Sequence, residues 1–512
     1  MKRNILLITV IAAAIMELID TSIVNVALSY MSGNLGATLE DTSWVITAYA
    51  IANVIIIPIT SFLVARLGRR NYYIGSVILF TVASVLCGQA TSIWILVACR
   101  FFQGMGGGAL LSVSAAIVYE LFPKEKQNVA SALFGVGIFV GPTIGPTLGG
   151  LITENYSWPW IFYINVPIGI AVTIICSRML GEPAVKPTVG KIDWTGILLL
   201  AAGVGSLQTV LERGETDDWF AANYIVILTA IAVFGLSFFV WWELKIKSPV
   251  VNLRVLKNRN LSIAAVLTFV SGVGLFSSVY LTPVFAQRLL GFTPTATGLL
   301  LLPGAIFAIG GLLITARLLQ RGTPPVVMIT MGMFLFIFFT WRMSRLNLDA
   351  GSGDFYIPLI WRAIGIAIIT VPLSTLAVSG LEPKDMPQGT ALNNMMRQLG
   401  GSFGIAMVNT FLTRRNAVHR TDLISNITAG NLQVVERLSG YTRYFEGKGS
   451  SAFDARHQAL GLLDAGVVKQ SNALSFGDTY LLLGCIFLVS LPLLLLSSRK
   501  KGKKPQVALA DH

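Results

Sequence analysis

The chain has 512 residues, of which 54% are hydrophobic and only 12% charged, and its mean hydropathy is +0.70. Because soluble domains carry about twice this charged fraction, the composition predicts an integral membrane protein. The formal net charge of +13 is distributed in short basic clusters between apolar segments, which argues against a continuous nucleic-acid-binding face.

The cysteines and histidines exclude two further classes of protein. All four cysteines lie in apolar segments, so we expect no disulfide framework. All three histidines lie outside those segments. The sequence therefore predicts no metal or haem site inside the membrane, and no cofactor.

Apolar runs long enough to cross about 30 Å of hydrocarbon predict fourteen transmembrane helices in an all-α fold. The first run follows Met1–Arg3 without a small-residue cleavage site, so we expect it to be an uncleaved span. The predicted spans are 5–28, 44–64, 72–90, 93–120, 129–152, 161–180, 194–212, 222–244, 261–284, 295–316, 325–343, 356–378, 388–412 and 474–498.

The basic residues predict the orientation of these spans. The short loops on one side hold only four arginines, whereas the segments on the other side hold clusters such as 245–259 and 499–504. We expect the basic side to be cytoplasmic. This orientation places both termini in the cytoplasm.

Two acidic residues, Glu17 and Asp20, lie inside the first span. A charge within a span costs about 2.5–3.5 kcal/mol on insertion scales, so such residues are functional candidates. Their spacing places both on one helix face, where two carboxylates in a poorly solvated cavity cannot both ionise cheaply. We expect this pair to carry a proton. The alternatives are a Glu17 that only faces an aqueous vestibule, and an Asp20 that only bonds a neighbouring helix.

Arg100 and Gln103 share a face of the fourth span by the same spacing. Because an arginine is always charged, Arg100 needs a carboxylate or carbonyl groups around it. We expect Arg100 to set the proton affinity of the first-span carboxylates, the alternative being a purely structural tie. Arg362 and Arg397 are the candidates in the second half of the chain, for packing or for anionic substrates.

The fifth span contains a repeated glycine–proline pattern. Gly141 and Gly145 allow a second helix to approach closely, while Pro142 and Pro146 each remove a backbone donor and kink the helix. This pattern predicts a helix that bends or slides between two conformations, as a transporter requires. A kinked helix with only a packing role is the alternative.

Polar residues within or near the spans are the expected substrate contacts, although each could instead form an interhelical hydrogen bond. They are Thr21, Asn25, Gln103, Tyr280, Gln287, Asn393 and Arg397.

Segment 413–473 is the only sizeable piece predicted to lie outside the membrane. Apolar residues at helical spacing in 452–469 predict a helical hairpin. The hairpin is either a docking surface or a solvated linker.

The chain also repeats itself. Leu121-Phe-Pro-Lys-Glu125 is echoed by Leu381-Glu-Pro-Lys-Asp385, and Arg100 by Arg362. These matches predict two homologous six-helix halves in parallel orientation, as in the major facilitator fold. The predicted parts are the N-terminal half (1–180), an inserted helix pair with cytoplasmic linkers (181–260), five helices of the C-terminal half (261–412), an extracytoplasmic, partly helical loop (413–473), the last transmembrane helix (474–498) and a basic cytoplasmic tail (499–512).

Several motifs occur in a fixed order along the chain. Span 1 carries Ile19-Asp-Thr-Ser-Ile-Val-Asn-Val-Ala-Leu28, and span 4 carries Arg100-Phe-Phe-Gln-Gly104. The glycine–proline run and Trp160-Ile-Phe-Tyr-Ile-Asn-Val-Pro-Ile-Gly169 follow. Over nearly all of its length the chain thereby resembles the 14-helix drug:H+ antiporters of the major facilitator superfamily, most closely the EmrB-type multidrug efflux pumps.

This resemblance implies a proton-coupled antiporter that exports lipophilic toxic compounds by alternating access. It implies an inner-membrane pump that works with a periplasmic adaptor protein and, through it, with an outer-membrane channel. Asp20 is the residue that the family motif assigns to proton coupling. The residues expected to act in gating or conformational change are Arg66, Gly68, Arg69, Gly104, Gly141, Pro142, Gly145, Pro146 and Arg362.

The loop after the second span departs from the family pattern. Ser61 stands in place of a glycine and Ala65 in place of an aspartate. The charge lock usually assigned to that aspartate is therefore absent or supplied by another residue.

Other classes of function lack their motifs. The sequence has no phosphate-binding loop for an ATP-driven pump, and no histidine or serine elbow within the spans for a hydrolase, so we expect no enzymatic activity. The alternatives that remain are a proton-uncoupled facilitator and an exporter of a specific metabolite, fatty acid or siderophore. Glu17 and Asp20 favour the coupled antiporter, because an uncoupled facilitator needs no buried acids.

Overall fold

The computed structural model describes residues 2–123, 127–181, 193–246, 249–382, 385–428 and 430–496, and all regular secondary structure in these ranges is helical. The N-terminal region contains α1 (Lys2–Leu35), α2 (Leu39–Leu67), α3 (Arg69–Gly88), α4 (Ile93–Glu120), α5 (Gln127–Asn155), α6 (Trp160–Tyr163) and α7 (Asn165–Met179). The middle region contains α8 (Trp194–Arg213), η2 (Trp219–Ala221), α9 (Asn223–Lys245) and η3 (Leu253–Lys257). The C-terminal region contains α10 (Arg259–Arg288), α11 (Pro294–Gln320), α12 (Pro325–Met343), α13 (Ser352–Val378), α14 (Met386–Ser425), α15 (Leu432–Gly447), α16 (Ala452–Ser490) and η4 (Leu491–Leu496).

Short polar residues begin several of these helices. The Thr38 hydroxyl caps α2 by accepting a hydrogen bond from the Asp41 N–H at 3.0 Å, and Ser92 and Thr293 cap α4 and α11 in the same way. Gly68 ends α2 with φ at +81°, a backbone conformation that glycine adopts without a steric penalty. The chain therefore turns sharply from α2 into α3.

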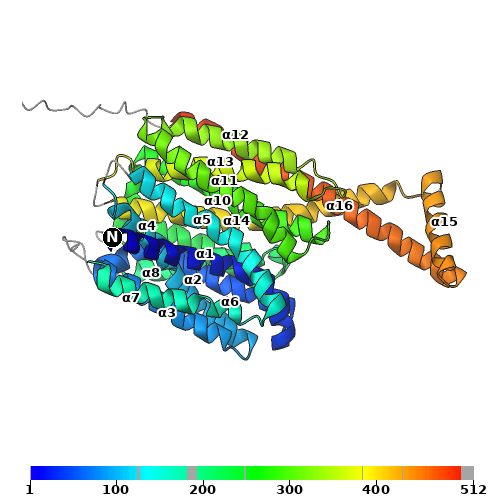
Figure 1. Cartoon of the computed structure of the whole chain (residues 1–512), viewed down its shortest axis with the longest axis horizontal. Helices are drawn as coiled ribbons and strands as arrows, with labels where there is room; N and C mark the ends of the chain where they lie inside the picture. Colours follow the sequence, from blue (N-terminus) through cyan, green and yellow to red (C-terminus); the bar gives the residue numbers. More distant parts are fainter. Residues whose placement is uncertain are drawn as a thin grey trace, which may run out of the picture.

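Twelve helices among the described residues are long and apolar enough to cross a membrane. Two more long helices, α5 and α14, are not among the twelve, and α14 carries Asn393, Asn394 and Arg397 near its start. The fold is a bundle of apolar helices that run roughly along one direction (Figure 1). The count of fourteen spans remains a prediction.

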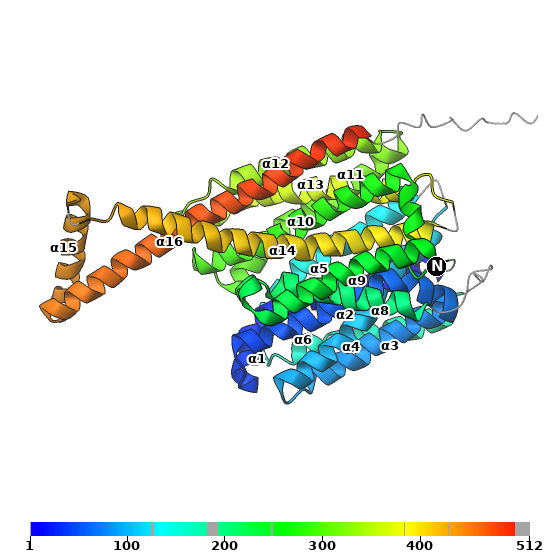
Figure 2. The ribbon, with the colours of Figure 1, turned by 180° about the vertical axis from the view of Figure 1, so that it is seen from behind.

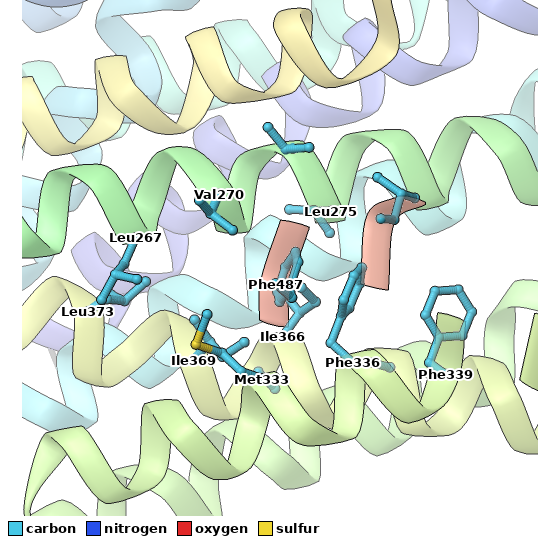
Figure 3. Close-up of a cluster of buried hydrophobic side chains, with 14 of the residues drawn as sticks. Leu267, Val270, Leu275, Met333, Phe336, Phe339, Ile366, Ile369, Leu373 and Phe487 are labelled. Carbon is cyan, nitrogen blue, oxygen red and sulfur yellow. The ribbon is translucent and has the colours of Figure 1, made fainter. Parts of the chain in front are cut away.

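Helices α1 to α7 pack mainly on one another, and so do α10 to α14 with α16. In the second group, Leu267, Val270 and Leu275 of α10 face side chains of α12, α13 and α16 (Figure 3). The rings of Phe336 and Phe487 stack there with centroids 4.1 Å apart. Between the groups, α5 packs on α11 and α2 packs on α14, and these two pairs form most of the contact between the N-terminal and C-terminal helices.

Helices α8 and α9 pack against each other at the side of the bundle. Helix α8 also packs on α2 and contacts α14, so it touches both groups of helices. Figure 2 shows this pair beside α14.

Helices α14 and α16 extend beyond the bundle, at the end opposite the N-terminus, and α15 crosses their far end (Figures 1 and 2). Segment 413–473 thus comprises the end of α14, all of α15 and the first part of α16. Polar contacts join the two long helices: Arg415 pairs with Asp478 at 2.6 Å, and Arg420 with Asp464 at 3.0 Å.

Candidate functional site

The glycines of α5 pack on the helix that carries the two acidic residues. A Cβ atom added to Gly141 would collide with Leu18, and one added to Gly145 would collide with Ser22. A Cβ atom on Gly149, one turn further, would lie 2.9 Å from the Ile23 carbonyl oxygen. The small-residue pattern predicted from the sequence therefore lies directly against α1, and it fixes the position of Glu17 and Asp20 relative to α5.

Asp20 forms a buried ion pair with Arg100 of α4. The Arg100 Nη1 donates to Asp20 Oδ2 at 2.5 Å, and both side chains are at most 1% exposed. Asp20 Oδ1 accepts from Gln103 Nε2 at 2.9 Å and from Asn165 Nδ2 of α7 at 2.8 Å. Both carboxylate oxygens of Asp20 are therefore satisfied, as a buried anion requires.

The Arg100 guanidinium is held by contacts besides this ion pair. Its Nε donates to the Val45 carbonyl oxygen of α2 at 3.2 Å, and its Nη1 donates to Gln103 Oε1 at 2.8 Å. Its Cζ lies 4.1 Å from the centre of the Tyr49 ring, a cation–π contact. Arg100 thus connects α1, α2 and α4.

Glu17 lies one turn before Asp20 and has a different environment. Its Oε1 accepts from Tyr49 Oη at 3.2 Å and from Asn53 Nδ2 at 3.0 Å, both on α2. Its Oε2 has no hydrogen-bond partner among the described residues, and the side chain is 3% exposed. Tyr49 therefore joins the two acids, because it donates to Glu17 and its ring faces the guanidinium that pairs with Asp20.

The predicted substrate-contact residues do not form one group. Gln103 belongs to the Asp20 cluster, and the Thr21 hydroxyl donates to the Leu18 carbonyl oxygen of its own helix at 2.9 Å. Asn25 is exposed, whereas Tyr280 and Gln287 on α10 are half-buried.

Asn393 and Arg397 line a cavity between the two groups of helices. Its lining comes from the last turns of α4 and α13 and the first turns of α5 and α14. The cavity volume is about 30 Å³, enough for a water molecule or two but far below the roughly 300–1,000 Å³ of ligand pockets. The helices must therefore separate to admit a drug-sized molecule. Its lining residues are Ala115, Tyr119, Phe134, Gly135, Thr370, Ser374, Ala377, Val378, Thr390, Asn393, Asn394 and Arg397.

The start of α3 makes a charge contact, although position 65 at the end of α2 holds no aspartate. Arg69 forms an ion pair with Glu120, the last residue of α4, and donates to the Gly181 carbonyl oxygen at 3.1 Å. Arg66, in the last turn of α2, is exposed. The ion pair with Glu120 thus joins the start of α3 to the end of α4.

The remaining predicted gating residues differ in their surroundings. Gly104 lies against the Tyr49 carbonyl oxygen, where an added Cβ atom would collide with α2. The backbone of Pro142 and Pro146 lies within α5, whose helix continues through both residues. Arg362 of α13 is 6% exposed, and its Nη1 has no hydrogen-bond partner among the described residues. Within the described part of the chain, Arg362 forms no ion pair like the one between Arg100 and Asp20.

Sequence reasoning missed Tyr49, Asn53 and Asn165, which complete the two acid environments. Asn165 lies inside the motif Trp160–Gly169 quoted above, but the motif assigns it no contact. The sequence did contain a signal for the asparagines: an amide side chain inside an apolar span needs a hydrogen-bond partner, as a carboxylate does. Sequence reasoning also missed Gln208 and Glu212 of α8, for which the same signal exists.

Comparison with known proteins places the chain in a family. The model of the Major Facilitator Superfamily matches residues 10–405. Multidrug export protein EmrB of Escherichia coli (strain K12) is 33% identical over 96% of this chain and 94% of its own length. Fatty acid resistance protein FarB of Neisseria gonorrhoeae is 31% identical over 95% of this chain and 94% of its own length. Colistin resistance protein EmrB of Acinetobacter baumannii is 30% identical over 96% of this chain and 94% of its own length.

A solved structure agrees with the fold. The human organic anion transporter MFSD10 (TETRAN) superposes with a TM-score of 0.60 over 96% of this chain and 99% of its own, at 12% identity. The family match, the relatives and the apolar helices lead to one conclusion: the chain is a multi-pass membrane protein and belongs to the major facilitator superfamily.

Proposed function

We propose that this drug-efflux transporter is a proton-coupled antiporter, which exchanges protons for lipophilic small molecules by alternating access. The observation that carries the proposal is the pair of buried carboxylates, Asp20 and Glu17, joined through Tyr49 and Arg100. Buried charges are costly in a membrane, and a facilitator without coupled protons has no use for two acids. The multidrug, fatty-acid and colistin resistance relatives support the class of substrate.

The two acids have different roles in this mechanism. Asp20 accepts hydrogen bonds from Arg100, Gln103 and Asn165, and it ties α1 to α4 and α7. Glu17 has one oxygen without a partner, so it can hold a proton without loss of an existing hydrogen bond. A proton on Asp20 would weaken its tie to Arg100 and release α4 from α1. Arrival of a proton thus changes the contacts within the N-terminal helices.

The substrate path runs between the two groups of helices. With both termini in the cytoplasm of the inner membrane, the cavity at Asn393 and Arg397 lies on the cytoplasmic side. It widens when the helix pairs α5–α11 and α2–α14 part at this end. The unpaired Nη1 of Arg362 offers a charge for anionic substrates.

The proton gradient supplies enough free energy for export. One proton that crosses a potential of roughly 150 mV releases about 3.5 kcal/mol. This free energy supports a substrate gradient of a few hundredfold. No cofactor is required.

The test is proton release from the purified, reconstituted protein when a lipophilic drug is added. We expect release in the wild type, none in Asp20→Asn, and a reduced amount in Glu17→Gln. Asp349→Asn, at an exposed acid of the α12–α13 loop, is the matched control and should behave as the wild type. Drug binding without release in the wild type would favour an uncoupled facilitator.

The hairpin of α14, α15 and α16 is the proposed docking surface for a periplasmic adaptor protein, which leads to an outer-membrane channel. Its far end exposes apolar side chains, among them Leu432 at 70% and Phe453 at 74%. Exposed apolar groups of this kind mark interaction sites. Replacing both by serine should leave drug binding intact and abolish co-purification with the adaptor; unchanged co-purification would refute the assignment.

A further inference from the structure

Helix α8 of the inserted pair carries a polar side chain that joins the two groups of helices. Gln208 is fully buried, and its Nε2 donates to Ser402 Oγ of α14 at 2.8 Å. The same Nε2 donates to Glu212 Oε1 at 2.7 Å. Glu212 in turn accepts from Thr47 Oγ1 of α2 at 3.0 Å. A chain of hydrogen bonds thus runs from α2 through α8 to α14.

Further contacts attach the end of α8 to α2. Arg213 is 4% exposed and donates to Ser43 Oγ at 2.5 Å. Its Cζ lies 5.2 Å from the centre of the Trp44 ring. Because Thr47, Ser43 and Trp44 all lie on the first turns of α2, helix α8 is bound to α2 over this end of the bundle.

The turn after α8 makes a second contact with α14. Trp219 Nε1 donates to Thr410 Oγ1 at 3.2 Å and to Glu215 Oε2 at 2.9 Å. Asp218 and Trp219, with φ of 55° and 49°, are the only non-glycine residues with positive φ in the described part of the chain. Such conformations are strained and persist where the surroundings hold them. The strained turn directs Trp219 toward α14.

We propose that α8 and this turn form a latch that closes the outer side of the transporter. The latch moves with α2, and its Gln208–Ser402 and Trp219–Thr410 contacts to α14 form when the outer side is shut. They must break when α2 and α14 part there. The inserted helices thereby set how readily the outward-open state forms. This inference rests on the proposed alternating-access function and its orientation.

A crosslink tests the latch directly. Gln208→Cys and Ser402→Cys are introduced together after the four native cysteines are replaced, and a short bifunctional thiol reagent joins them. We expect transport before crosslinking, a loss of at least about tenfold after it, and recovery when the link is cleaved. Leu199→Cys with Gly235→Cys is the matched control within the inserted pair, since a Cβ atom on Gly235 would lie 3.8 Å from the Leu199 carbonyl oxygen. Its crosslink should leave transport unchanged.

A distance measurement separates failure of the latch from failure of the proposed transport. Spin labels at Asn34 and Val418, exposed positions on α1 and α14, report the separation of the outer ends. Losing the hydrogen bond to α14 in Gln208→Ala or Trp219→Phe should raise the outward-open population about two- to tenfold. Full transport in the crosslinked protein, or unchanged distances in both variants, would overturn the latch even if drug transport is confirmed. Changed distances without transport would support the latch and count against the proposed function.

Discussion

Replacing Asp20 by asparagine is the sharpest test of the buried ion pair. Asparagine preserves the shape of the side chain but removes the negative charge, so Arg100 remains buried without a counter-ion. Removing one partner of a buried pair costs about 3–5 kcal/mol of folding free energy. Arg100 keeps the Val45 carbonyl, the Gln103 side-chain oxygen and the Tyr49 ring, which places the expected loss near the lower limit, about 3 kcal/mol.

The assay is an SDS unfolding titration of the purified protein in mixed micelles, followed by tryptophan fluorescence. The double variant Asp20→Asn/Arg100→Met should regain most of the lost stability, because the uncompensated charge is gone. It should nevertheless fail in drug-triggered proton release. Asp349→Asn is the control. A single variant within about 0.5 kcal/mol of the wild type, or a double variant less stable than the single one, would refute the reasoning.

Three further predictions concern α2, α5 and α13. Tyr49→Phe keeps the ring over Arg100 but removes the hydrogen-bond donor to Glu17. The pH profile of transport should therefore shift, while the free energy of unfolding falls by only about 1 kcal/mol. An unchanged pH profile would contradict the link between the two acids. Gly145→Leu should prevent α5 from packing on α1 and abolish the folded protein on gel filtration, whereas Gly310→Leu, at a glycine with open space around it, should not. Arg362→Met should weaken the export of anionic compounds about tenfold and leave the export of neutral compounds unchanged, as measured by efflux from loaded cells. An equal loss for both kinds of compound would indicate that Arg362 has a packing role.

The outcome for the acids shows why some contacts were predictable. An arginine in an apolar span requires a counter-ion, and the first span offers two carboxylates. The expectation that Arg100 needs a carboxylate or carbonyls therefore agrees with the Asp20 pair and the Val45 carbonyl. Spacing alone did not decide which acid pairs with Arg100, because one helix face can present its side chains to two different neighbours.

The sequence by itself determined that the chain consists of apolar helices, and that polar groups within them have to find partners. It also determined the close approach of a helix at Gly141 and Gly145, since only glycine leaves room for a neighbouring backbone. Only the tertiary structure decided that this neighbour is α1, that Glu120 pairs with Arg69, and that α8 joins α2 to α14. These contacts join residues far apart in the chain, and their partners depend on how whole helices are placed, which no local pattern encodes.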